Sequence, residues 1–298
     1  MVTGAFGYTG RYIARRLLAY GRRVVTVTGH PHRADPLREH LTVAPMDFDD
    51  EEGLARAMEG AETLYDTYWI RFSRGEMTFE RAVENSRRLV RAAERAGLRR
   101  IVYVSITGAS PDSPLPYFRG KGLVEEVIRS SSLSWAILRP TLVFGLEDVL
   151  VNNMAWFLRR WPLFPVPGRG DYPVQPVYVD DLAALAISLG QGRDDVTLDA
   201  VGPETYTFEE LLRLLAKAVD SRARLVHLPP WASLLAAKAA GPLVKDVVLT
   251  RDEIRGLMAG LLASSGLPTC TTSFRRWVEE TGPRLGRRYA SELERHYR

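Results

Sequence analysis

The stretch VTGAFGYTGRYIARRLLAYG, residues 2–21, places Gly4, Gly7 and Gly10 three residues apart, directly before an amphipathic helical pattern. Glycine weakens a helix and costs backbone entropy, so this cluster indicates that something approaches the main chain closely. A strand, a tight turn with glycines spaced GxxGxxG and a helix together form a dinucleotide site, in which the pyrophosphate rests on the helix N-terminus. The alternative is that the three glycines serve only a tight turn and helix packing.

Strand-like and helix-like patterns alternate along the first half of the chain. Short apolar or β-branched runs predict strands, and apolar residues at i, i+3 and i+4 predict helices. We expect strands within 22–30, 41–50, 63–70, 99–108 and 135–145, and helices within 11–21, 51–60, 79–97 and 121–130. This alternation predicts an α/β protein of the Rossmann type, with a doubly wound parallel sheet covered on both faces.

The regular alternation ends after Gly145. Residues 146–173 are rich in Trp, Pro and Gly, and the pattern from Glu204 onward is mainly helical. The pattern returns to a strand, a helix and a strand in between, so we expect the first domain to resume there. The predicted division is a dinucleotide-binding domain of residues 1–148 with 173–202, and a smaller, mainly helical cap of residues 149–172 and 203–298.

Composition restricts the class of protein. The 298 residues are 46% hydrophobic and 26% charged, which is ordinary for a globular protein. The single cysteine, Cys270, excludes an internal disulfide framework, and the five histidines show no metal-ligand spacing, so we predict no metal. The net charge of +4 is spread among carboxylates, which does not favour a nucleic-acid partner. With no bilayer-length apolar run and no signal-peptide pattern, we expect a cytoplasmic protein without a membrane partner.

Four motifs carry a resemblance to a known family. TGAFGYTG (3–10), YFRGK (117–121), LRPTLVFG (138–145) and QPVYVDDLA (175–183) occur in the order and at the separations typical of the extended and atypical short-chain dehydrogenases/reductases. The chain looks most similar to the NmrA-like and complex I accessory-subunit-like branch, which is grouped with NAD-dependent epimerases and dehydratases. The similarity covers nearly the whole chain and is least specific over the last ninety residues.

The resemblance implies an NAD(P) cofactor on the glycine loop. In this family an acid at the end of the second strand binds the ribose of NAD, whereas cations accommodate the 2′-phosphate of NADP. Here Gly29 is near the acid position, His30 and Arg33 follow, and no carboxylate occurs before Asp35, which favours NADP over NAD. Arg33 as a solvated loop residue is the alternative. The further cofactor contacts implied are Gly4, Phe6, Gly7, Tyr8, Thr9, Gly10, Asp47, Phe48, Thr67, Tyr68, Lys121, Pro140 and Thr141.

Tyr117 and Lys121 are the predicted catalytic pair. Four residues apart on one helix, they share a face, and a nearby ammonium lowers the pKa of a phenol so that it can exchange a proton during hydride transfer. A surface tyrosine stacked on a lysine stem is the alternative. The resemblance implies a third residue, Ser or Thr, after the fifth strand. Ser105 and Thr107 are the candidates, whereas Ile106 in that slot could not act.

These residues predict an oxidoreductase or epimerase that acts on a carbonyl or hydroxyl group of a small molecule by hydride transfer. The competing hypothesis is an NAD(P)-bound redox sensor or assembly protein without turnover, because the usual doubled serine is missing. Two further features remained open. The aromatic residues of 156–164 either cap an apolar substrate or pack a lid, and Asp180 and Asp181 are expected to cap a helix.

Overall fold

The computed structural model describes residues 1–296, and the chain forms two compact units. The first unit comprises Met1–Pro140 and Val179–Ala200, and the second comprises Thr141–Tyr178 and Val201–Arg298. The expected division placed residues 141–148 and 173–178 in the dinucleotide-binding domain. The structure places the strands of these segments in the second unit, because β7 (Leu142–Phe144) and β10 (Pro176–Tyr178) pair with each other and not with the large sheet.

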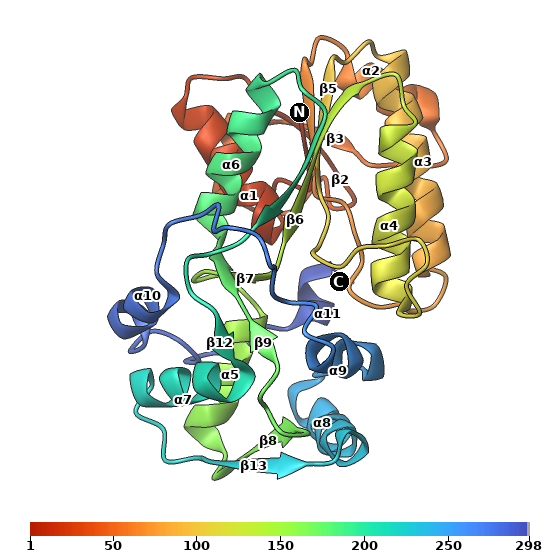
Figure 1. The fold of residues 1–298 in the computed structure, drawn as a ribbon. Coiled ribbons are helices and arrows are strands. Elements are labelled where there is room, and N and C mark those ends of the chain that lie inside the picture. Colours follow the sequence, from red (N-terminus) through yellow and green to blue (C-terminus); the bar gives the residue numbers. More distant parts are fainter. Residues whose placement is uncertain (297–298) are drawn as a thin grey trace. The chain divides into compact units, whose positions relative to one another are not determined.

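A seven-stranded parallel sheet forms the centre of the first unit, in the order β11-β6-β5-β4-β1-β2-β3 (Figure 1). Its strands are β1 (Val2–Thr3), β2 (Val25–Thr28), β3 (Thr42–Pro45), β4 (Thr63–Asp66), β5 (Arg100–Val104), β6 (Ser134–Pro140) and β11 (Val196–Ala200). The strand order reverses at β1, which pairs with β2 on one side and β4 on the other. In doubly wound sheets, ligands bind at the carboxyl ends of the strands beside such a reversal.

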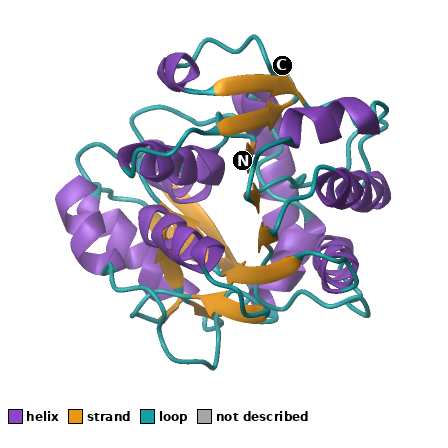
Figure 2. Ribbon diagram, turned by 90° about the horizontal axis from the view of Figure 1, so that it is seen from above, coloured by secondary structure: helices purple, strands orange, loops and turns teal. Residues whose placement is uncertain are grey.

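Helices cover both faces of this sheet (Figures 1 and 2). On one face α1 (Tyr8–Ala19) packs against α6 (Val179–Gln191), and on the other α3 (Phe79–Arg95) packs against α2 (Glu51–Met58) and α4 (Pro116–Arg129). A short 3-10 helix, Pro36–His40, follows β2. Because both faces are covered, all five residues of β5 are buried. The predicted Rossmann-type α/β fold is therefore confirmed.

Three two-stranded sheets and six helices make up the described part of the second unit. Besides β7 and β10, its strands are β8 (Leu163–Pro167), β9 (Pro173–Val174), β12 (Tyr206–Thr207) and β13 (Arg224–Leu228). Its helices are α5 (Leu150–Arg160), α7 (Phe208–Ala218), α8 (Pro230–Val244), α9 (Arg251–Met258), α10 (Phe274–Thr281) and α11 (Glu292–His296). The parallel pairing of β13 with β8 was not predicted, because it joins segments about sixty residues apart.

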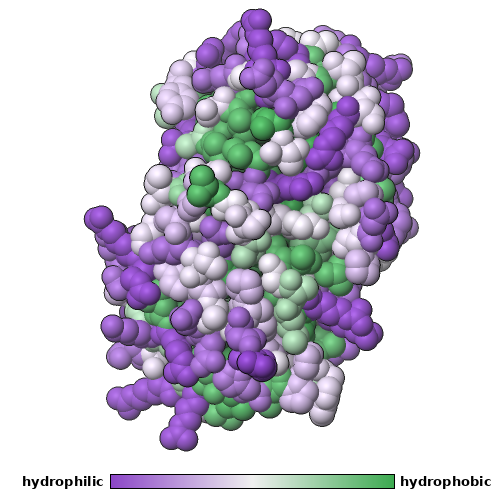
Figure 3. Space-filling model, in the orientation of Figure 1, coloured by the Kyte–Doolittle hydropathy of each residue, from purple (hydrophilic) through white to green (hydrophobic). Residues whose placement is uncertain are grey.

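The sequence contains many arginines, and ion pairs on the surface account for many of them. On the face drawn in Figure 3, hydrophilic side chains cover much of the surface, with separate hydrophobic patches between them. Many arginines pair with carboxylates, as Arg91 does with Glu51 at 2.7 Å. Among the described residues, no helix has the length and apolar character needed to cross a membrane.

Candidate functional site

The glycine loop joins β1 to α1, and its own backbone requires glycine. Gly4 has a φ of +61°, which lies in the left-handed region that favours glycine. A Cβ on Gly10 would lie 2.5 Å from the carbonyl oxygen of Gly4 and 3.0 Å from that of Thr3. Gly7, the N-cap residue of α1, donates its amide hydrogen to the Gly4 carbonyl at 2.7 Å. Chain packing therefore explains part of the glycine motif. No side chain caps the N-terminus of α1, and an anion-binding helix N-terminus requires this lack of a side-chain cap.

Threonine side chains fix this loop to the neighbouring strands. The amide of Ala5 donates to Oγ1 of Thr26 in β2 at 3.1 Å. Thr67, just after β4, donates its amide to Oγ1 of Thr3 at 2.7 Å and its hydroxyl to the Thr3 carbonyl at 2.8 Å. Thr67 thus lies beside the loop and uses its hydroxyl to hold the loop in place, and its predicted contact with the cofactor stays a prediction.

The segment after β2 carries the groups that would select the cofactor. Gly29 is exposed, and an added Cβ there would meet nothing within 4 Å. The amide of Arg33 donates to the His30 carbonyl at 3.1 Å in a turn. The first carboxylate after the strand, Asp35, is buried and forms an ion pair with Arg11. That pairing occupies the group that could otherwise bind a ribose hydroxyl.

Arg11 is a candidate cofactor residue that the sequence analysis missed. It lies in the first turn of α1, and its guanidinium donates to the Phe6 carbonyl at 3.3 Å as well as to Asp35. It therefore connects the glycine loop to the segment after β2. An arginine directly after Gly10 was the available signal, but only the fold shows that its side chain reaches that segment.

Three of the residues predicted to contact the cofactor, Asp47, Phe48 and Tyr68, follow the carboxyl ends of β3 and β4. The rings of Phe48 and Tyr68 are 4.9 Å apart between centroids. The Tyr68 hydroxyl accepts a hydrogen bond from Asn85 of α3 at 2.9 Å. Asp47 is exposed, and its carboxylate accepts from the amide of Asp49 at 2.9 Å. Phe48 and Tyr68 thus form one aromatic surface, while Asp47 caps a local turn.

Tyr117 and Lys121 occupy successive turns of α4, and Trp69 contacts both. The Tyr117 ring lies 6.1 Å from that of Trp69 and 6.0 Å from that of Phe79, in edge-to-face geometry. The Lys121 ammonium lies 5.0 Å from the Trp69 ring centroid and donates to the Val104 carbonyl at 2.7 Å. The Lys121 side chain is only 3% exposed, so Lys121 is not a surface lysine.

Burial shifts the pKa values of two oppositely charged side chains in this region, Lys121 and Asp66, towards neutral pH. Burial lowers the pKa of Lys121 to about 7, although the carboxylates of Asp66 and Glu125 oppose the shift. Burial also raises the pKa of Asp66 to about 6, against hydrogen bonds from Thr3 and the Tyr68 amide. Within the described residues, Oδ2 of Asp66 has no hydrogen-bond partner. Perturbed, buried ionisable groups at a strand end are typical of functional sites.

The two candidates for the third catalytic residue differ in their surroundings. The Ser105 hydroxyl donates to the buried carboxylate of Glu125 at 2.6 Å, and the same carboxylate binds Arg139. Thr107 donates its amide to the Pro140 carbonyl at 3.0 Å, and its hydroxyl lies 3.4 Å from the same oxygen. Ser105 therefore has a strong structural partner, which favours Thr107 for the catalytic slot. Both roles remain predictions.

Several other expected residues lie in local structural contacts. Thr141 belongs to the second unit and donates its hydroxyl to the Gln175 carbonyl. Asp180 lies in the first turn of α6 and forms a two-bond ion pair with Arg16 at 2.6 and 2.8 Å, so the expected helix cap is replaced by a contact with α1. In α5, the Trp156 ring lies 5.4 Å from that of Tyr289, which is the packing expected of a lid or core segment.

No group of three or more His, Cys, Asp or Glu side chains within the described part of the chain could hold a metal ion. The residues gathered at the carboxyl edge of the first unit's sheet instead offer a helix N-terminus, cations and a buried lysine. This donor set suits a phosphate-bearing organic cofactor and not a metal. Its chemistry is that of phosphate binding combined with proton exchange.

Comparison with known proteins agrees with this geometry. Residues 4–145 match the family model described as NAD(P)H-binding. The chain is 29% identical over 285 residues to the mitochondrial NADH dehydrogenase (ubiquinone) 1 alpha subcomplex subunit 9 of Arabidopsis thaliana, covering 88% of this chain and 70% of that protein. It is 27% identical over 239 residues to a ceramide reductase of Caulobacter vibrioides, covering 76% and 73%.

Solved structures show the same fold. An NADPH-dependent quinone oxidoreductase of Escherichia coli, crystallised with NADPH, matches with a TM-score of 0.75 at 23% identity, over 94% of this chain and 98% of that one. At that identity the likeness bears on the fold. The match to the NAD(P)H-binding family model, residues 4–145, covers most of the first unit.

Proposed function

We propose that the chain is a member of the extended and atypical short-chain dehydrogenase/reductase superfamily, and that it is an NADP(H)-dependent oxidoreductase or epimerase acting on a small carbonyl or hydroxyl compound. The observation that carries this proposal is the buried Lys121, four residues after Tyr117 at the carboxyl end of β5. A dinucleotide bound at the glycine loop would supply or accept the hydride. The side chains of the protein would bind that dinucleotide and hold the proton.

Tyr117 is the proposed proton donor or acceptor, and Lys121 is its electrostatic partner. While Lys121 is protonated, its charge on the same helix face favours the phenolate and so lowers the pH at which the phenol can exchange its proton. Tyr117→Phe should abolish the loss of NADPH absorbance at 340 nm with an active quinone, ketone or aldehyde, while the Kd for NADPH stays unchanged. Arg119→Gln, two residues after Tyr117 on α4, is the control. Full turnover by the Tyr117→Phe variant would remove that residue from the mechanism.

We propose NADP(H) over NAD(H) because the carboxylate of Asp35 is paired with Arg11 of α1, while Arg33 supplies a cation in the segment after β2. A charged hydrogen bond to the 2′-phosphate is worth about 1.5–3 kcal/mol, so Arg33→Gln should raise the Kd for NADPH roughly 10- to 150-fold. The Kd for NADH should change little. Arg22→Gln, an exposed arginine of the same unit, is the matched control. Tighter binding of NADH than of NADPH by the unmodified protein would contradict this preference.

One observation favours a second function, a cofactor-bound protein without turnover. The Ser105 hydroxyl is held by Glu125, and the similar Arabidopsis protein is named as a subunit of a larger dehydrogenase. Tight NADPH binding without loss of absorbance across quinones, ketones, aldehydes and sugar nucleotides would support this function. Turnover with any one of these substrates would refute it.

A further inference from the structure

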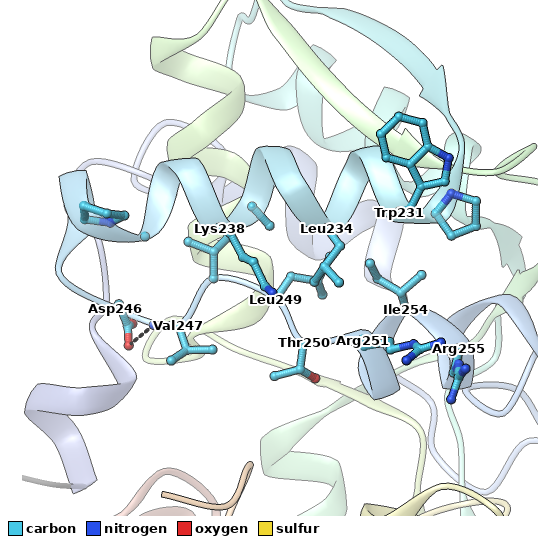
Figure 4. Close-up of a pocket in the computed structure, with 15 residues that line it drawn as sticks. Trp231, Leu234, Lys238, Asp246, Val247, Leu249, Thr250, Arg251, Ile254 and Arg255 are labelled. Atoms are coloured by element: carbon cyan, nitrogen blue, oxygen red, sulfur yellow. Dashed lines mark hydrogen bonds between the residues drawn. The ribbon is translucent and has the colours of Figure 1, made fainter.

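A cavity of about 1030 Å³ lies within the second unit, between α8 and the segment that leads into α9 (Figure 4). Pockets that bind organic ligands measure roughly 300–1,000 Å³, so this volume is sufficient for one. Much of the lining is apolar. It includes Trp231, Leu234, Val247, Leu249 and Ile254.

The charged residues of the cavity are mainly cations. Lys238, Arg251 and Arg255 line it and, among the residues that the structure describes, form no ion pair. Figure 4 shows Lys238 on the same side of α8 as Leu234, toward Leu249, with both arginines on the α9 side. Arg251 begins α9, where the helix dipole disfavours a positive charge, so its guanidinium adds nothing to the stability of that helix.

The one carboxylate of the cavity does not neutralise these cations. Asp246 is buried and accepts hydrogen bonds from the amides of Val247 at 2.9 Å and Glu292 at 2.8 Å, and from the Tyr289 hydroxyl at 3.2 Å. Its charge therefore serves the connection between α8 and the C-terminal segment. Among the residues that the structure describes, no other carboxylate lines the cavity to pair with these cations.

Helix α8 also exposes more apolar surface than a helix of this length normally does. Trp231 is 70% exposed, Leu235 61% and Leu243 76%. Contiguous exposed apolar patches mark interaction sites, and Trp231 also lines the cavity. The cavity thus has an apolar wall along α8, interrupted by Lys238, and two arginines at its α9 end.

We propose that this cavity binds a single-chain amphiphile with an anionic headgroup, a long-chain carboxylate or phosphate ester. The apolar chain lies along α8 between Leu234 and Ile254, and the headgroup pairs with Arg251 and Arg255. A space between two elements suits one chain, whereas docking on a bilayer would use only the outer face of α8. This assignment is independent of the hydride-transfer function, because it rests on the second unit alone.

The test probe is decyl phosphate, used below its critical micelle concentration. Inorganic phosphate is the control for the headgroup alone, and the uncharged decyl maltoside is the control for the apolar chain. Isothermal titration should show saturable 1:1 binding of decyl phosphate, at least tenfold tighter than decyl maltoside, and no binding of phosphate. Equal affinity for both decyl compounds, or no saturable binding, would overturn the proposal. So would binding to phosphatidylglycerol vesicles alone, which would indicate a membrane-docking surface.

Amino-acid substitutions distinguish the binding of the headgroup from the binding of the apolar chain. The double substitution Arg251→Gln with Arg255→Gln should weaken decyl phosphate binding at least tenfold, and Leu234→Asp should weaken both decyl compounds. Arg222→Gln with Arg224→Gln removes the same charge from exposed positions of the same unit and should change nothing. Thermal unfolding checks that each variant is folded. Unaltered binding by the Arg251/Arg255 variant would refute the assigned headgroup site.

Discussion

Replacement of Gly10 by alanine tests whether the packed glycine loop holds the cofactor. The new Cβ would lie 2.5 Å from the oxygen and 2.9 Å from the carbon of the Gly4 carbonyl, and 3.0 Å from the Thr3 oxygen. All three atoms belong to the backbone, so no side chain can rotate away. Overpacking of this kind costs about 1–3 kcal/mol, although alanine returns up to about 1 kcal/mol of helix propensity.

The loop can relieve the contact only by moving away from α1, which displaces the amides that face the pyrophosphate. If 1–3 kcal/mol is lost from binding, the Kd for NADPH rises about 5- to 140-fold, because 1.4 kcal/mol is a factor of ten. Titration of the tryptophan fluorescence with NADPH measures this change, and urea unfolding measures the accompanying loss of stability.

Gly192→Ala is the matched control for this substitution. Its Cβ would lie 3.4 Å from the Leu189 carbonyl oxygen, an ordinary contact, and Gly192 follows α6 in the same unit. We expect a change within about 0.5 kcal/mol in stability, and no change in NADPH affinity. A folded Gly10→Ala variant that binds NADPH within twofold of the unmodified protein would refute the role assigned to the loop.

Two predictions concern the buried charges. Glu125→Ala leaves Arg139 without its carboxylate partner, so the free energy of unfolding in urea should fall by about 3–5 kcal/mol. The exposed Glu126→Ala should change it by less than about 0.5 kcal/mol, and equal effects would contradict the structure. Lys121 has a folded-state pKa of about 7, below its ordinary 10.5, so the unfolded chain binds more protons between these values. Stability should therefore rise with pH across that window, by at most about 1.4 kcal/mol per pH unit, and Lys121→Met should remove this slope. An identical slope in both proteins would disprove the burial of the ammonium.

Local sequence patterns were sufficient for the elements and the order of the first unit. The spacing of Gly4, Gly7 and Gly10 predicted the loop, and alternating strand and helix periods predicted the parallel sheet, because each depends on residues a few positions apart. The pair Tyr117 and Lys121 was found for the same reason. One helical turn places both residues on α4 without any information from the rest of the chain.

Contacts between distant segments decided the rest. The run 135–145 reads as one strand, yet it is divided into β6 and β7 because β7 pairs with β10, more than thirty residues further along the chain. Strand pairing of this kind leaves no periodic signal in either partner. The sequence therefore placed the boundary between the units several residues too late.

The electrostatic character of the site also depended on the tertiary structure. The sequence shows Ser105 as a catalytic candidate, whereas the fold gives its hydroxyl to Glu125, and the ion pair of Asp35 with Arg11 has no signal in the sequence. Lys121 reads as an ordinary lysine until the packing of α4 against the sheet removes it from water. Charge, pKa and hydrogen-bond occupancy depend on which groups surround a side chain in space, and only the packed structure determines those neighbours.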